Sequence, residues 1–252
     1  MPIVRAGPLL IYYAHVPKCA GSAIEQYLEA RFGSIALVDT RHHAKPSAER
    51  WSRTSPQHLD LATLQRLFPD GFFDYSFAVV RHPVARIVSA YHFQLEIEQH
   101  ASARMGFSAW LDMLPEMMEE DPFIFDNHTK PMSELVPEDA QIFHLEHSTD
   151  ALVPWFDSLT NSTSGPRALK RVNDRKGRGD KTKVEPGPLD LQRIAEIYAD
   201  DFERFGYEID SKAPLAEAPV LDPAFVAERD AELARQSSLG AWLREKVDRV
   251  RR

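Results

Sequence analysis

A lysine, a glycine and a serine stand close together in the stretch His15–Ile24, which reads HVPKCAGSAI. This combination is suited to holding a phosphate, because Lys18 supplies a full positive charge and Gly21 lets the backbone approach a ligand closely. Backbone N–H groups at the start of a helix point to one place and carry the positive end of the helix dipole. If a helix begins here, the stretch predicts an anion site.

The residues on either side predict the strand and the helix that would form such a site. Leu9–Ala14, LLIYYA, is a short apolar run of the kind found in buried strands. After the stretch, Gly33 is a typical helix stop. Between them, four apolar residues recur at helical spacing: Ile24, Tyr27, Leu28 and Phe32. The order of residues does not fit an ATP-type P-loop, GxxxxGKS or GxxxxGKT, because Lys18 comes before the glycine.

A second set of anion-binding residues follows the apolar run Tyr75–Val80, which is typical of a buried parallel strand. Arg81 ends this run, and Pro83 suits the first turn of a helix. The core face of that helix is predicted by four residues: Val84, Ile87, Val88 and Tyr91. Arg86 and Ser89 lie on a different side, and we interpret both as not needed for the core. Arg81 and Ser89 could together hold a second phosphate, since guanidinium groups bind phosphate with paired hydrogen bonds.

Together, the two stretches resemble the PAPS-dependent carbohydrate sulfotransferases of family 2, the group of the heparan- and chondroitin-sulfating enzymes and their bacterial relatives. HVPKCAGSAI resembles the 5′-phosphosulfate loop, usually H-I/V-P-K-T-A/G-G-T/S, with Cys19 in place of the commoner threonine. VVRHPVARIVSAYHF resembles the 3′-phosphate motif, with His82 in place of the usual Asp or Asn. The motifs stand in the right order, and the resemblance covers about residues 9–210.

The resemblance implies that PAPS donates the sulfuryl group and that 3′,5′-ADP is the product. It assigns Lys18 to the oxygen that leaves the sulfur, and it implies that protein cations supply the charge, so that no metal ion is expected. The residues implied in PAPS binding are Pro17, Lys18, Cys19, Ala20, Gly21, Ser22, Ala23, Arg81 and Ser89. RKGRGD also resembles the RKGxxGD loop of cytosolic sulfotransferases, which adds Arg175, Lys176 and Gly177 to the 3′-phosphate site.

Transfer to a hydroxyl also needs a general base, and histidine is suited to that role near neutral pH. The chain has ten histidines, so the choice stays open. His58 is the first candidate because its segment resembles the His-containing segment of the family. His128, in a stretch that resembles the acceptor-side loop, is the second. His42 and His43 are the third.

Three further residues have smaller expected roles. Glu146, at the predicted end of a strand, is expected to orient a basic residue. His15 is expected to shape the phosphate loop rather than to react. Cys19 stands near a helix start, which lowers a thiol pKa and leaves a nucleophilic role open. The commoner threonine at that position argues that the thiol is not essential.

The composition limits the classes of function. The net charge of −8, from 38 acidic and 30 basic residues, disfavours a general nucleic-acid binder and requires any phosphate site to be local. The single cysteine excludes an internal disulfide and a multi-cysteine zinc site. No apolar run approaches the roughly 20 residues that span a bilayer, and no signal pattern is visible. We therefore expect a cytoplasmic bacterial protein, or a trimmed lumenal domain if the source is eukaryotic.

Alternating apolar runs and helical patterns predict an α/β fold with a central parallel sheet between helices, a three-layer P-loop-like arrangement. Strands are predicted at 9–14, 35–38, 75–80 and 141–146. Helices are predicted at 24–32, at 59–68, from 83 to about 120, and at 191–206. We expect a sulfotransferase domain at 1–210 and a helical extension at 211–252, with helix after Pro223.

Three functions stay open. The first is sulfuryl transfer from PAPS to a hydroxyl of a carbohydrate or glycoconjugate. The second is a P-loop nucleotide kinase or NTPase. Two observations argue against it: Lys18 is misplaced for a P-loop, and Arg81 stands where a magnesium-binding Asp is expected. The third is a catalytically inactive protein that binds 3′,5′-ADP. Acceptor identity and oligomeric state also stay open.

Overall fold

A four-stranded sheet forms the centre of the structure, a computed structural model that describes residues 2–98, 105–170 and 184–237. The strands, in the order in which they lie, are β1 (Ile3–Ala6), β2 (Leu9–Ala14), β3 (Tyr75–Val80) and β4 (Gln141–His144). β2, β3 and β4 are parallel, whereas β1 pairs with β2 in antiparallel fashion. The predicted strands at 9–14 and 75–80 are confirmed, and the one at 141–146 ends two residues earlier.

The first strand of the sheet differs from the sequence prediction. β1 reaches β2 through a turn at Gly7, whose φ of 64° is left-handed and easily adopted by glycine. The predicted strand at Ile35–Val38 is wrong. A single bridge links Ala36 to β1, and Leu37 has a φ of 56°, which interrupts an extended chain.

Eight α-helices lie within the described residues. They are α1 (Gly21–Phe32), α2 (Leu61–Leu67), α3 (Pro83–Glu96), α4 (Phe107–Glu120), α5 (Leu152–Thr160), α6 (Pro188–Ile197), α7 (Ala199–Phe205) and α8 (Pro223–Ser237). The helix predicted at 191–206 is in fact two, because Tyr198 leaves the helical conformation between α6 and α7. None of the helices in the described ranges combines the length and apolar character of a membrane span.

Six single-turn 3₁₀ helices punctuate the connections within the described ranges. They are η1 (His42–Ala44), η2 (Ser47–Glu49), η3 (Pro56–His58), η4 (Ile124–Asn127), η5 (Met132–Glu134) and η6 (Leu145–His147). Two of them, η3 and η4, carry residues of the site described below. The predicted loop Arg175, Lys176 and Gly177 lies outside the described residues.

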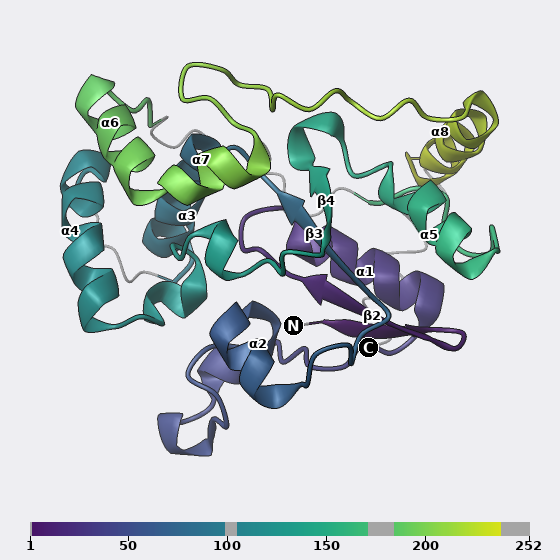
Figure 1. The fold of residues 1–252 in the computed structure, drawn as a ribbon, viewed down its shortest axis with the longest axis horizontal. Coiled ribbons are helices and arrows are strands. Elements are labelled where there is room, and N and C mark those ends of the chain that lie inside the picture. The colour runs from purple at the N-terminus through teal and green to yellow at the C-terminus, as the bar shows by residue number, and fades with distance from the viewer. Residues whose placement is uncertain (1, 99–104, 171–183, 238–252) are drawn as a thin grey trace.

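Helices cover both faces of the sheet, as the predicted three-layer arrangement requires (Figure 1). Successive strand residues point to opposite faces. Tyr13 and Phe77 stack with ring centroids 4.8 Å apart on one face, where Phe156 of α5 packs against Phe77. Tyr12 points to the other face and stacks on Phe73 at 5.2 Å. The fold is therefore α/β, with a sheet that is parallel except for its first edge strand.

A second hydrophobic core joins α3, α4 and α6, which lie together on the left of Figure 1. Its buried members are Ile87, Ala90, Tyr91, Phe107, Trp110, Leu111, Leu114, Ile194 and Tyr198. The predicted core face of α3 is thus confirmed at Ile87 and Tyr91. One side of α3 is committed to this core, which leaves another side to meet the loops at the carboxyl ends of the strands.

The buried carboxylate of Asp201 ties α7 to the segment before β4. It accepts hydrogen bonds from the backbone N–H groups of Met132, at 2.9 Å, and Ser133, at 2.8 Å. Burial raises the pKa of Asp201, although the charge of Arg86 and these hydrogen bonds lower it. The Asp201 side chain therefore fixes the segment before β4 by accepting two backbone hydrogen bonds.

We expect Asp201→Ala to lower the free energy of unfolding by about 2–4 kcal/mol, because two buried N–H groups lose their acceptor. Urea unfolding followed by circular dichroism measures this change. Asp200, its exposed neighbour, offers a matched control, and Asp200→Ala should change stability by less than about 0.5 kcal/mol. Equal effects of the two substitutions would contradict the role of Asp201.

Candidate active site

The loop between β2 and α1 has the backbone geometry of an anion site. Lys18 and Ala20 have φ values of 70° and 65°, both left-handed. Left-handed residues within a turn direct neighbouring N–H groups to one side, which forms an anion-binding concavity. Gly21 begins α1, so the unpaired N–H groups of a helix start lie beside that concavity. The loop thus joins two sources of partial positive charge to the full charge of Lys18.

Gly21 is required because the ring of His15 lies against its backbone. A Cβ atom on Gly21 would lie 1.7 Å from Nε2 of His15. Nδ1 of His15 is 2.7 Å from Oε1 of Glu25. Burial lowers the pKa of His15 to about 4, although Glu25 raises it, so the imidazole is neutral at neutral pH. His15 therefore supports the loop without adding charge to it.

Cys19 is fully buried in the core. Burial raises the pKa of its thiol to about 12, although Arg86 and Arg81 lower it. Burial therefore disfavours the thiolate that a nucleophilic role for Cys19 would need, and that role stays untested. Its side chain serves packing beneath the loop.

Arg81 brings a second cation to the same loop. Its Nη1 donates a hydrogen bond to the carbonyl oxygen of Lys18 at 3.2 Å. This is a consequence of the sheet, because β2 and β3 are parallel neighbours whose carboxyl ends share one edge. Ser89 lies half-buried on α3, one turn before Phe93 and on the same side of the helix. The ammonium of Lys18 lies 3.9 Å from the centre of the Phe93 ring, so Lys18, Arg81 and this side of α3 border one region.

His82 caps the helix that follows Arg81. Its Nδ1 accepts from the N–H of Val84 at 3.2 Å, and its Nε2 is 3.0 Å from the carbonyl oxygen of Glu208. His82 therefore caps the N-terminus of α3, as an Asp or Asn at this position would. Glu146 accepts from the N–H of His82 at 2.8 Å and from the hydroxyl of Tyr207 at 2.9 Å. It orients the start of α3 rather than the basic side chain that was expected.

Arg86 departs furthest from the sequence interpretation, because its side chain is only 2% exposed. Its Nε donates to the carbonyl oxygen of Pro17 at 3.2 Å. Its Nη2 donates to the carbonyl oxygens of His128, at 3.3 Å, and Lys130, at 2.7 Å. The interpretation that the core does not need Arg86 is wrong, since these bonds compensate the burial of its charge. The guanidinium joins the phosphate loop to the segment 121–134.

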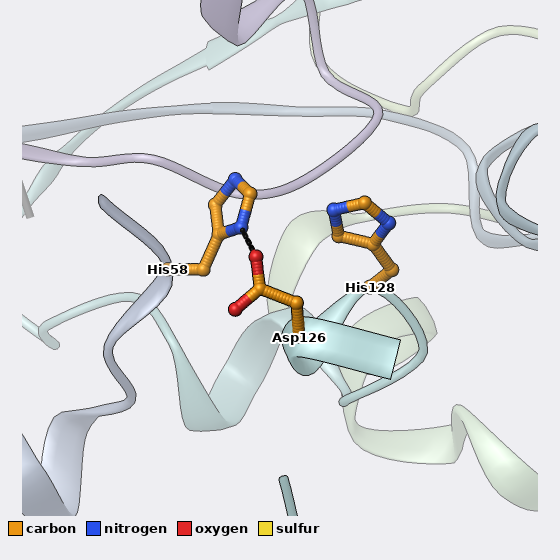
Figure 2. Close-up of side chains that lie close together, drawn as sticks. All are labelled: His58, Asp126 and His128. Carbon is orange, nitrogen blue, oxygen red and sulfur yellow. Dashed lines mark hydrogen bonds and ion pairs between the residues drawn. The ribbon is translucent and has the colours of Figure 1, made fainter. Parts of the chain in front are cut away.

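That segment contains a left-handed turn of three residues, none of which is glycine. Phe125, Asp126 and Asn127 have φ values of 53°, 56° and 60°. This conformation costs about 1–2 kcal/mol for a residue such as Phe125 and less for Asp126 and Asn127, because Asp and Asn adopt it more readily. The turn is held by two bonds to the chain around η3: the N–H of Ser55 donates to Oδ1 of Asp126 at 2.6 Å, and Nδ2 of Asn127 donates to the carbonyl oxygen of His58 at 2.8 Å. The strain directs the Asp126 carboxylate at the His58 ring (Figure 2).

His58 and Asp126 form a hydrogen-bonded pair. Nδ1 of His58 is 2.7 Å from Oδ2 of Asp126, which also accepts from the hydroxyl of Ser55 at 2.6 Å and contacts Nε2 of His43 at 3.1 Å. Burial raises the pKa of Asp126, but the charge of His58 and the hydrogen bonds from His43 and His58 hold it well below its usual range. An ionised carboxylate only accepts hydrogen bonds, so Nδ1 of His58 carries the hydrogen. When the ring is neutral, Nε2, on the side away from Asp126, carries the lone pair that a base needs.

His128 lies beside this base but is in a different state. Its ring centroid is 5.0 Å from that of His58, and its Nδ1 is 3.2 Å from Nε2 of Gln94. Burial and the charge of His58 lower the pKa of His128 well below its usual value. Phe93 lies 4.8 Å from His128 and carries the Lys18 ammonium on its ring. The rings of Phe93, His128 and His58 thus link the phosphate loop to the base.

The structure brings together some of the predicted residues and not others. The loop Pro17–Ala23, Arg81, His58 and His128 gather at one edge of the sheet, and His43 joins them through Asp126. His42 is buried beside His43, and its Nε2 has no hydrogen-bond partner among the residues that the structure describes. Sequence reasoning missed Asp126, although a carboxylate two residues before a candidate base was a usable signal.

Comparison with known proteins identifies the family. The model of the sulfotransferase family (Sulfotransfer_2) matches residues 2–208. The chain belongs to the sulfotransferase family. Searches of curated proteins and of solved structures found no significant match. The anion loop and the His58–Asp126 pair lie within the matched residues, and the sequence resemblance to family 2 is confirmed.

We expect Gly21→Ala to destabilise this sulfotransferase by about 2 kcal/mol or more, because the added methyl overlaps the His15 ring. The double variant His15→Ala/Gly21→Ala removes the obstacle and should lose less stability than the sum of the two single variants. Thermal unfolding of the four proteins measures the coupling. Strict additivity would show that the His15–Gly21 contact does not shape the loop.

Proposed function

We propose that this sulfotransferase moves a sulfuryl group from PAPS to a hydroxyl of a carbohydrate or glycoconjugate. The observation that carries the proposal is the juxtaposition of an anion loop and an oriented base. Lys18 and Arg81 lie on the first side, His58 and Asp126 on the second, and the Phe93 and His128 rings lie between them. In-line transfer requires a leaving oxygen and an attacking oxygen on opposite sides of sulfur.

The residues of the first side fit the anionic groups of PAPS, which supplies an activated sulfuryl group on a phosphate. The N–H groups of Cys19–Ser22 would hold the 5′-phosphate at the helix start. Arg81 and Ser89 would face the 3′-phosphate, to which the sequence adds Arg175–Gly177. The ammonium of Lys18 would stabilise the charge that grows on the leaving oxygen. These assignments agree with the left-handed Lys18 and Ala20, whose N–H groups the loop turns to one side.

On the second side, Nε2 of His58 would take the proton of the acceptor hydroxyl. Asp126 fixes the tautomer that makes this nitrogen a base and stabilises the imidazolium that forms. General-base catalysis of this kind contributes about 10²–10⁴-fold. His128, which burial keeps neutral, serves as a wall of the site rather than as the base.

The acceptor class rests on the family resemblance of the two anion motifs to the carbohydrate-sulfating enzymes. The net charge of −8 supports a small or locally bound acceptor over a long nucleic acid. Acceptor selectivity is proposed to lie in the segments 95–135 and 160–188, the first of which includes α4 and the left-handed turn beside His58.

We expect 3′,5′-ADP to bind at least about 10-fold more tightly than ADP without magnesium, because a second cationic region meets the 3′-phosphate. Isothermal titration calorimetry tests this preference. Lys18→Ala should lower kcat by about 10²–10³, whereas Lys212→Ala, at an exposed site, should not. Equal affinity for the two nucleotides, or ATP hydrolysis that depends on magnesium, would refute the donor assignment.

We expect His58→Ala to lower kcat by about 10²–10⁴ while 3′,5′-ADP affinity persists, because the base does not hold the donor. Asp126→Asn should lower kcat as well, because an amide no longer fixes the Nδ1–H tautomer. Transfer of labelled sulfate to a panel of sugars, phenols and peptides gives the rates and the acceptor class. His147→Ala is the control. Transfer to phenols alone would disprove the carbohydrate part of the proposal.

A further inference from the structure

We propose that His58, Asp126 and His128 also form a zinc-binding site, and that zinc bound there blocks the transfer reaction. The inhibitory part rests on the proposed role of His58 as the base. One ligand atom from each of the three residues lies within 4.8 Å of the others. Figure 2 shows the two imidazoles and the carboxylate gathered around one space, with His58 on one segment and Asp126 and His128 on another.

The set of donors selects the metal. Two imidazole nitrogens and one carboxylate oxygen suit zinc, which binds both at about 2.0–2.2 Å in a tetrahedron. Calcium and magnesium prefer oxygen ligands throughout. Donor atoms of a tetrahedral zinc site lie roughly 3.3 Å apart, from the same bond lengths. That value lies between two separations in the structure. Nδ1 of His58 is 2.7 Å from Oδ2 of Asp126, and no two of the three ligand atoms are more than 4.8 Å apart.

The ligands are already oriented by their neighbours. Nε2 of Gln94 lies 3.2 Å from Nδ1 of His128, and Figure 2 shows the other ring nitrogen, Nε2, turned toward His58. For Nε2 to bind zinc, the ring hydrogen of His128 must move from Nε2 to Nδ1, and the Gln94 amide must turn so that its Oε1 accepts that hydrogen. Ser55 holds both oxygens of Asp126, through its N–H and its hydroxyl. Partners of this kind fix ring orientation and carboxylate position in metal sites. The side chains of His58 and Asp126 are each 11% exposed and His128 is 6% exposed, so the protein encloses the three ligands mostly but not completely.

Binding of zinc would invert the tautomer on which the base depends. The ion takes the place of the hydrogen on Nδ1 of His58: the N–H bond breaks and a zinc–nitrogen bond forms. The released proton binds Nε2 through solvent, so the imidazole stays neutral and no electron is transferred. Nε2 then carries a hydrogen and has no lone pair for the acceptor proton. His58 could therefore act as a base or bind zinc, but it could not do both at once.

The test begins with calorimetric titration of zinc chloride into EDTA-treated protein. We expect one ion per chain, with affinity at least about 10-fold weaker in Asp126→Asn and in His128→Gln. His147→Gln, which alters a histidine outside the three, should bind as the unaltered chain does. Absence of saturable binding up to millimolar zinc, or equal binding by all four proteins, would overturn the site.

A measurement on the unaltered chain keeps the test decisive if a variant does not fold. Cobalt(II) should replace zinc and give the intense visible bands of a low-coordinate ion with nitrogen ligands, and zinc should displace it. The weak spectrum of hexaaqua cobalt in the presence of the protein would overturn the site.

Transfer assays then separate this inference from the proposed function. In EDTA, the enzyme should transfer sulfate; zinc should stop transfer, and excess EDTA should restore it, with 3′,5′-ADP affinity unchanged throughout. Full activity with the zinc site saturated would overturn the inhibitory role. Absence of transfer in EDTA would overturn the proposed function, while the titration would still decide whether the zinc site exists.

Discussion

Most of the active site depends on one buried guanidinium. Arg86 holds the carbonyl oxygens of Pro17, His128 and Lys130, which belong to the anion loop and to the segment that carries Asp126. Because one rigid, planar group makes all three bonds, the distance between the phosphate loop and the base is set by the guanidinium and not by either loop. An ammonium group lacks that fork of donors, so lysine is a poor substitute at this position.

The helix that carries Arg86 is shared between two structures. Ile87 and Tyr91 face the second core with α4 and α6, whereas Arg86 and Phe93 face the catalytic region. Packing of three helices therefore fixes the direction in which the guanidinium points. The same fourteen-residue helix therefore contributes both to the packing of the second core and to the position of the site residues.

The sequence predicts the features that depend on local patterns and misses those that depend on distant contacts. The β2 and β3 strands, the turn at Lys18 and the start of α1 follow from apolar runs and from one glycine. β1 has only four residues, too few for a pattern to stand out. The burial of Arg86 and the pairing of Asp126 with His58 follow from tertiary contacts across 42 and 68 residues, which no local spacing reveals. The predicted strand at 35–38 failed because Leu37 turns left-handed.

The left-handed turn at Phe125–Asn127 has an evolutionary consequence. The left-handed conformation of Phe125 lowers the stability of the fold, yet the turn places Asp126 beside His58, the base proposed above. Selection for stability alone would replace one of these residues with glycine and relax the backbone. Glycine at Asp126 would remove the carboxylate itself, and glycine at Asn127 would remove the hydrogen bond to the carbonyl oxygen of His58. Substitutions that stabilise this turn are thus expected to lower the rate of the reaction while the protein still folds.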